Sequence, residues 1–251
     1  MDLGLKGLKV IIGGAGRGIS RETVKVMAAE GCDFGLFSRN PEALADVEKE
    51  LGSRGKVVTQ EFVHESRDGY KKMLTGLADK LGGCDIFIHS ISSSGAQGTM
   101  DWDESFRLDI LGAVDGCEAL EPYLAKSSAA SIVLMSSTAA VETFIVPQAF
   151  NAMKAGLLTY GKQLSQAWAG KGIRVNMVSP GPISYPGGNW EGIKAMMPDL
   201  YTATLAQIPI GRMGSPKDVA NAIAFIASPA ASYITGTNVV IDGGFTKRVQ
   251  F

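Results

Sequence analysis

The sequence predicts an α/β fold in which a parallel sheet of about seven strands carries helices on both faces. Short apolar runs alternate with longer amphipathic segments along the 251 residues. The short runs lack a polar face, which is typical of strands buried on both sides. No linker, repeat or low-complexity tract divides the chain. We therefore expect a single domain over residues 1–251, wound in both directions from the middle of its sheet.

The elements follow in alternation. The first strand lies within residues 8–14 and leads through a glycine turn into a helix that Gly31 ends. The second helix begins with Asn40 as N-cap and Pro41 in the first helical position. Further strands are expected within residues 33–40, 56–62, 85–90, 131–137, 174–179 and 238–242, and further helices within residues 67–81, 102–125, 148–170 and 215–228.

Residues 183–209 interrupt this pattern. The segment follows a strand and contains Pro, Gly, Trp and Tyr, so we interpret it as a long loop. Loops of this length in compact domains often have a function. The segment is therefore either a lid over a substrate or a surface excursion.

Composition excludes several classes of protein. The net charge is −1 and the basic residues are scattered, so no nucleic-acid surface is expected. We find no membrane-spanning run and no signal peptide, which indicates a cytoplasmic protein. Cys32, Cys84 and Cys117 lack metal-ligand spacing, and their odd number argues against a disulfide framework. We expect buried thiols in a reducing compartment and no metal site.

The stretch GGAGRGIS, residues 13–20, lies between the first strand and the first helix. Glycines permit a tight turn and close backbone approach, and the helix N-terminus presents N–H groups to a diphosphate. This placement predicts a Rossmann-type dinucleotide site. We expect Gly14, Arg17, Gly18 and Ile19 to contact the cofactor.

The turn resembles the Thr-Gly-x-x-x-Gly-x-Gly motif of the short-chain dehydrogenase/reductase family. Gly13 stands in place of the Thr and Ser20 in place of the last Gly. Residues 173–183 and 211–244 are similar to the family's sixth strand and to its last helix and strand. The resemblance covers nearly the whole chain and implies an oxidoreductase with a nicotinamide cofactor and a small-molecule substrate.

The second strand ends in Ser38 and Arg39. An acidic residue here would bind the ribose 2′-hydroxyl of NAD(H), whereas Arg39 and Arg17 suit the 2′-phosphate of NADP(H). NADP(H) is therefore favoured over NAD(H), the alternative being two solvated surface arginines. The resemblance implies further cofactor contacts at Val63, His64, Ser90, Ile91, Lys154, Pro180, Gly181 and Ile183.

The resemblance also implies a catalytic set of Ser, Tyr and Lys supported by an Asn. Ser137 matches the serine and Lys154 the lysine. Phe150 stands four residues before Lys154 and thirteen after Ser137, where the family has its tyrosine. Asp109 stands at the Asn position. The chain therefore lacks the phenol that gives a proton to the substrate in ordinary members.

Other departures occur in the same region. Ile88–Ser92, IHSIS, stands where the family has Asn-Asn-Ala-Gly. It resembles a strand end of enoyl-acyl-carrier reductases, but their longer Tyr–Lys spacing would require a tyrosine at Pro147. His89 is either a structural residue or a proton donor. The coincidence with Asp109 and Phe150 favours a naturally diverged site over an engineered Tyr-to-Phe variant.

The leading hypothesis is an NADP(H)-dependent oxidoreductase with a modified catalytic site. Its substrate would be a carbonyl or alcohol, an imine or an activated alkene. Asp109 is expected to pair with Lys154. The proton would come from water, Asp109 or a residue of 183–209 such as Tyr185 or Tyr201.

Two alternatives stay open at this point. One is non-redox lyase, dehydratase or isomerase chemistry on the same scaffold. The other is a cofactor-binding protein without dehydrogenase activity. The family also implies a homotetramer, or a homodimer, formed through residues 106–124 and 148–168 and the chain end at 248–251.

Overall fold

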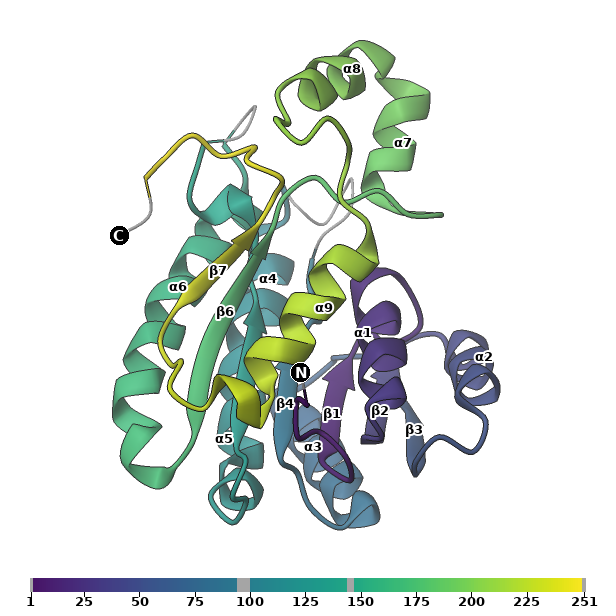
Figure 1. Cartoon of the computed structure of the whole chain (residues 1–251), viewed down its shortest axis with the longest axis vertical. Helices are drawn as coiled ribbons and strands as arrows, with labels where there is room; N and C mark the ends of the chain where they lie inside the picture. The colour runs from purple at the N-terminus through teal and green to yellow at the C-terminus, as the bar shows by residue number, and fades with distance from the viewer. Residues whose placement is uncertain (1, 94–99, 144–146, 250–251) are drawn as a thin grey trace.

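The computed structural model describes residues 2–93, 100–143 and 147–249, which form the predicted doubly wound α/β domain (Figure 1). All strand pairs in the sheet are parallel, and the strand order is β3-β2-β1-β4-β5-β6-β7. The strands are β1 (Lys9–Gly13), β2 (Asp33–Ser38), β3 (Val57–Glu61), β4 (Ile86–His89), β5 (Ser131–Met135), β6 (Arg174–Pro180) and β7 (Asn238–Ile241).

Helices cover both faces of this sheet. One face carries α1 (Gly18–Ala29), α2 (Pro41–Leu51) and α9 (Pro216–Ala227), and the other carries α3 (Arg67–Leu81), α5 (Gly112–Leu124) and α6 (Ala149–Trp168). In Figure 1, α9 and α1 lie in front of the strands.

Strand side chains alternate between the two cores. In β1, Val10 and Ile12 face the core under α1 and α9, and Ile11 faces the core under α3 and α5. In β4, Ile88 joins the first core and Phe87 the second. Alternation between two buried faces explains why these strands read as unbroken apolar runs.

The prediction of a loop at residues 183–209 is wrong. The segment contains α7 (Asn189–Met196) and α8 (Pro198–Ala206), which stand above the carboxyl ends of the strands in Figure 1. Pro198 takes the first position of α8, a start signal that the sequence contains. The Gly, Trp and Tyr content of this segment led to the prediction of a loop, although the segment forms two short helices.

The predicted single helix over residues 102–125 also needs correction. It consists of α4 (Trp102–Ser105), a π-helical turn η2 (Phe106–Leu111) and α5. The Gly112 N–H donates to the Arg107 carbonyl, five residues back. π-Helical turns often occur at functional sites, and this one contains Asp109.

The three cysteines are buried and free, in agreement with the prediction. Burial raises the pKa of Cys32 and of Cys117 to about 12, so these thiols stay protonated and unreactive at neutral pH. Within the described residues, no helix is both long and apolar enough to cross a membrane.

We expect Gly116→Ala to lower stability by about 1–3 kcal/mol, because α5 lies against the sheet at this glycine. A Cβ at Gly116 would lie 2.5 Å from Cζ of Phe87, which is fully buried. Gly76→Ala in α3 is the control, since a Cβ there meets nothing within 4 Å. It should stabilise by about 0.5–1 kcal/mol. Thermal unfolding measures both, and equal effects would contradict the packing described.

Candidate active site

A cavity of about 1020 Å³ opens at the carboxyl ends of the strands. It lies at the switch point of the sheet, between β1 and β4, where the strand order reverses. Its wall is formed by the segments that follow β1 to β6, by the start of α6 and by the 183–209 segment. Ligands of doubly wound sheets bind at this location. The volume is at the upper end for small-molecule sites, which suits a dinucleotide together with a substrate.

The cavity brings together nearly all the residues selected from the sequence. Its lining includes Ser137, Phe150, Lys154, Gly14, Arg17, Ile19, Ser38, Arg39, Val63, His64, Ser90, Ile91, Pro180, Gly181 and Ile183. Two predicted residues are not part of the wall. Gly18 lies against the ring of Tyr185, and Asp109 is fully buried behind Lys154, with which it pairs.

The glycine turn has the properties of an anion site. Gly14 has a φ of 66°, which favours glycine, and at Gly16 a Cβ would lie 2.7 Å from that of Ala43. Within the described residues, Arg17, the N-cap of α1, makes no side-chain capping bond, and the first turn has no acidic residue. By contrast, Asn40 caps α2. The N–H groups of α1 are therefore available to a diphosphate.

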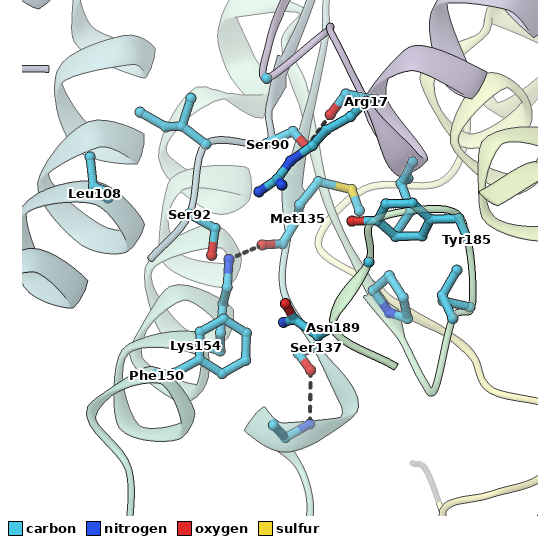
Figure 2. A pocket seen from close by; sticks show the side chains of 18 of the residues that line it. Arg17, Ser90, Ser92, Leu108, Met135, Ser137, Phe150, Lys154, Tyr185 and Asn189 are labelled. Carbon is cyan, nitrogen blue, oxygen red and sulfur yellow. Dashed lines mark hydrogen bonds between the residues drawn. The ribbon is translucent and has the colours of Figure 1, made fainter. Parts of the chain in front are cut away.

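A buried ion pair lies at the other end of the cavity. Lys154 Nζ is 2.9 Å from Asp109 Oδ1, and the two side chains are 3% and 0% exposed. Lys154 Nζ also donates to the Met135 carbonyl at 2.6 Å, as Figure 2 shows. The ion pair predicted from the sequence is therefore present. Met135 in β5 and Asp109 in η2 thus hold the Lys154 amino group in place.

Serines fix the other carboxylate oxygen. Ser93 donates to Asp109 Oδ2 from its backbone N–H at 3.1 Å and from its hydroxyl at 2.6 Å. The Ser105 hydroxyl lies 2.9 Å from the Ser93 hydroxyl. Ser93 and Ser105 are both buried. Because Ser93 Oγ gives its proton to Asp109, Ser105 is the donor in the second contact.

The charge of Asp109 follows from these contacts. Burial raises the pKa of the carboxyl, but the Lys154 ammonium and hydrogen bonds from Ser93 and Ser92 outweigh burial and hold the pKa below its usual value. Asp109 is therefore an anion at neutral pH. In Figure 2, Ser92 points from the cavity wall toward the Lys154 amino group.

Phe150 and Ser137 form the wall beside this pair. Lys154 Nζ lies 5.5 Å from the centre of the Phe150 ring, one helical turn away on α6. The Ser137 hydroxyl accepts from the Ala139 N–H at 3.1 Å. Among the described residues its own proton has no acceptor, and a carbonyl oxygen or developing oxyanion in the cavity is a suitable one.

The histidines occupy different parts of the site. His89 is fully buried at the end of β4, where burial and the Lys154 charge lower its pKa to about 3. It is uncharged at neutral pH, which fits the structural interpretation. His64 lines the cavity, and its backbone carbonyl accepts a hydrogen bond from Arg107. Arg107 also lines the cavity and was not selected from the sequence.

The 183–209 segment contributes mainly apolar side chains. Trp190, Ile193 and Met197 line the cavity, with Tyr185. Tyr201 does not line it; its ring lies 6.5 Å from that of Trp190. Figure 2 shows Tyr185 across the pocket from Lys154 and Phe150. Neither tyrosine of this segment stands beside the lysine.

Sequence reasoning missed Ser93 and Ser105. They follow β4 and precede η2. Ser105 stands four residues before Asp109, about one helical turn, whereas no spacing rule connects Ser93 to Asp109. The run of three serines at residues 92–94 was the available signal, because hydroxyls directly after a strand of such a sheet face its ligand edge.

Comparisons with known proteins agree with this geometry. A family model described as enoyl-(acyl carrier protein) reductase matches residues 14–246. Isoepoxydon dehydrogenase patN of Penicillium expansum is 36% identical over 100% of this chain and 99% of that protein.

Two solved structures share the fold. A short-chain dehydrogenase/reductase from Brucella melitensis has a TM-score of 0.88 at 29% identity, covering 99% of this chain and 100% of that one. L-sorbose reductase from Gluconobacter frateurii, complexed with NADPH and L-sorbose, has a TM-score of 0.87 at 25% identity over 99% and 100%.

The parallel sheet, the uncapped glycine turn and the cavity at the switch point define a dinucleotide-binding α/β oxidoreductase. The chain belongs to the short-chain dehydrogenase/reductase family.

We expect Asp109→Asn to lower the free energy of unfolding by about 3–5 kcal/mol, because Lys154 would keep a buried charge without its counter-ion. Asp109 has a lower pKa folded than unfolded, so its ionised form stabilises the protein above about pH 4, and this contribution is lost as the pH falls. The variant should therefore lose less stability between about pH 4 and pH 2. Urea unfolding across this range measures both effects.

The double variant Asp109→Asn with Lys154→Met removes both charges. It should be more stable than Asp109→Asn alone, since an uncharged pair has no buried ion to desolvate. Strictly additive losses would show that the two side chains do not interact.

Proposed function

We propose that this protein is an NADP(H)-dependent oxidoreductase whose catalytic site has been rebuilt, with Phe150 at the position of the family's catalytic tyrosine. Its substrate is a small imine, an activated alkene or a carbonyl or alcohol. The bound cofactor supplies or accepts a hydride. The residues of the chain orient the substrate and place the charges of Lys154 and Asp109 beside it.

The observation that carries this proposal is the environment of Lys154. Its amino group is bound by Asp109 and by the Met135 carbonyl, and it faces an aromatic ring instead of a hydroxyl. A lysine held in this way serves as a fixed positive charge beside the cavity. No phenol needs its pKa lowered by it.

Ser137 and Lys154 are the polar groups that the site offers to a substrate, and they determine which reductions it favours. Ser137 donates a hydrogen bond to the substrate oxygen, and the Lys154 charge favours electron density at that end of the cavity. Ketone reduction forms an alkoxide, which demands a proton at once. Reduction of an iminium forms a neutral amine, and reduction of a conjugated alkene spreads the charge over an enolate. These two reactions fit a site without a phenol: water protonates an imine to the iminium before hydride transfer, and it protonates the enolate after hydride transfer.

The names of the relatives support oxidoreduction without agreeing on a substrate. One is called an isoepoxydon dehydrogenase, one an L-sorbose reductase, and the matching family model an enoyl reductase. The apolar side chains of Trp190, Ile193 and Met197 favour a substrate with an apolar portion. We propose that residues 183–209 act as its lid.

Arg17 and Arg39 support the choice of NADP(H). Both line the cavity, and the second strand ends in Ser38 without a carboxylate. The L-sorbose reductase structure also contains NADPH.

We expect the wild type to oxidise NADPH faster with a cyclic imine or an enone than with simple ketones. Phe150→Tyr should raise ketone reduction less than about tenfold, because Asp109 and Met135 already hold Lys154. The measurement is NADPH consumption across ketone, imine and enone panels. Lys154→Met is the control, and it should lower every activity through the lost charge.

A gain of about a hundredfold or more in ketone reduction by Phe150→Tyr would contradict the rebuilt site, since it would show an ordinary reductase lacking one hydroxyl. Product formed without net NADPH oxidation would favour the non-redox alternative.

Arg39→Ala should weaken NADPH binding about ten- to a hundredfold and leave NADH binding nearly unchanged, because a guanidinium–phosphate contact contributes about 1.5–3 kcal/mol. Arg21→Ala is the matched control: Arg21 lies on α1 but pairs with Glu50 at 3.1 Å, outside the cavity. Calorimetric titration of both cofactors gives the ratio. Equal losses for the two cofactors would refute the assignment.

A further inference from the structure

Charged side chains are unevenly distributed along the cavity wall. Among the described residues, those that line it are Arg17, Arg39, Glu104, Arg107 and Lys154. Arg17 and Arg39 stand at the glycine turn and directly after β2, where the cofactor is proposed to bind. Glu104 and Arg107 lie 3.9 Å apart and pair with each other. Of this set, Lys154 is the one at the reacting end of the cavity, the wall formed by Ser137, Phe150 and Lys154.

Asp109 cancels most of the Lys154 charge beyond the immediate surroundings of the pair. Its Oδ1 atom is 2.9 Å from Lys154 Nζ, and two hydrogen bonds from Ser93 hold the other carboxylate oxygen. An unpaired ammonium about 6 Å away, at an effective dielectric constant of about 20, would strengthen the binding of an anion about a hundredfold. A carboxylate about 3 Å farther along the same line reduces that gain to about fivefold. The pair therefore acts on the atom next to Lys154 and attracts a charge elsewhere in a substrate only weakly.

The reacting end has few other groups, among the described residues, that could bind an anion. Ser137 has one proton to donate, and the Phe150 ring has none. An anionic group loses its water on entering such a place, and this cost exceeds the remaining attraction unless a counter-ion is present. A neutral group of the same size bears a much smaller cost. The charge of a substrate is therefore a basis for selection.

We propose that Asp109 sets the charge specificity of the site: by pairing with Lys154 it makes the reacting end select substrates without a carboxylate, phosphate or other anionic group. The inference rests on the proposed function and narrows its substrate class. The reduction itself is unchanged, because an enone still gains a hydride and a proton while NADPH becomes NADP+. Without its carboxylate, position 109 would leave Lys154 as an unpaired cation that attracts anionic substrates.

The test uses two enones that differ only in charge, the para-carboxamide and the para-carboxylate of 4-phenylbut-3-en-2-one. The substituent is distant from the alkene and ionised, in the carboxylate, at about pH 7.5. The measured quantity is kcat/KM for the carboxylate divided by kcat/KM for the carboxamide, at saturating NADPH. In the wild type the carboxylate should react at least about tenfold less efficiently.

Asp109→Asn should raise this ratio about ten- to twentyfold, because it leaves the Lys154 charge unpaired. Asp109→Asn with Lys154→Met removes both charges and should return the ratio to the wild-type value or below. Asp46→Asn is the matched control: it makes the same change at an exposed position of α2 outside the cavity lining, and the ratio should stay constant. Calorimetric titration of the NADP+ complex with both compounds gives the binding ratio for variants with slow turnover, since no reduction occurs there.

A purely structural role of Asp109 would lower both activities together, whereas the inference requires their ratio to change. The same ratio in the wild type and Asp109→Asn, or a wild type that prefers the carboxylate, would overturn the inference, and reduction of the carboxamide would still support the proposed function. If Asp109→Asn does not fold, the double variant tests the same claim, because a ratio above the wild-type value there would contradict it. If neither compound is reduced or bound, the inference is overturned, and the imine and ketone panels decide the proposed function.

Discussion

The ion pair between Lys154 and Asp109 is the constraint on which the rest of the site depends. Removing two charges from water costs several kcal/mol for each ion, so the pair persists only with good geometry and complete hydrogen bonding. The structure meets this condition through the Met135 carbonyl on one side and both donors of Ser93 on the other. The strand ends, the π-helical turn and α6 must therefore keep their relative positions.

The pair also divides the cavity into two ends of different chemistry. At the glycine turn, the donors of α1 and the guanidinium groups of Arg17 and Arg39 make an environment for anions. At the ion pair, the positive charge of Lys154 is largely balanced by Asp109, and the adjoining wall is the Phe150 ring. An anionic cofactor fits the first end, and the reacting part of the substrate fits the second. Residues 183–209 reach over both through Tyr185 and Trp190.

Much of this arrangement was predictable from sequence, because its causes are local. Apolar runs without a polar face identify buried parallel strands, and the glycine turn marks the ligand edge wherever it joins the first strand to a helix. Once these are placed, the topology carries Ser137, Phe150 and Lys154 to one cavity. The resemblance to the family placed Asp109 and Lys154 in one site, and their opposite charges then predicted the pairing.

The remainder depends on tertiary contacts that no local pattern encodes. The π-helical turn lies between α4 and α5, and Asp109 within it is buried behind the cavity wall instead of forming part of that wall. Ser93 and Ser105 are distant in sequence from Lys154 and join it only through the carboxylate. The sequence did not reveal α7 and α8 because both helices are short and Thr204 is the one buried residue that they contain, so no long buried stripe marks them.

The decisive measurement is the pH dependence of kcat with an enone substrate at saturating NADPH, because an enone has no ionisation of its own near neutral pH and kcat then reports the ionisations of the protein groups in the complex. Asp109 has its pKa below the usual value, that of His89 is about 3, and Phe150 has no proton to lose. A site without a titrating acid should give a nearly constant kcat between about pH 6 and pH 9. A single ionisation within that range, controlling tenfold or more of the rate, would reveal a tuned acid in the site and contradict a rebuilt site in which Lys154 is only a fixed charge.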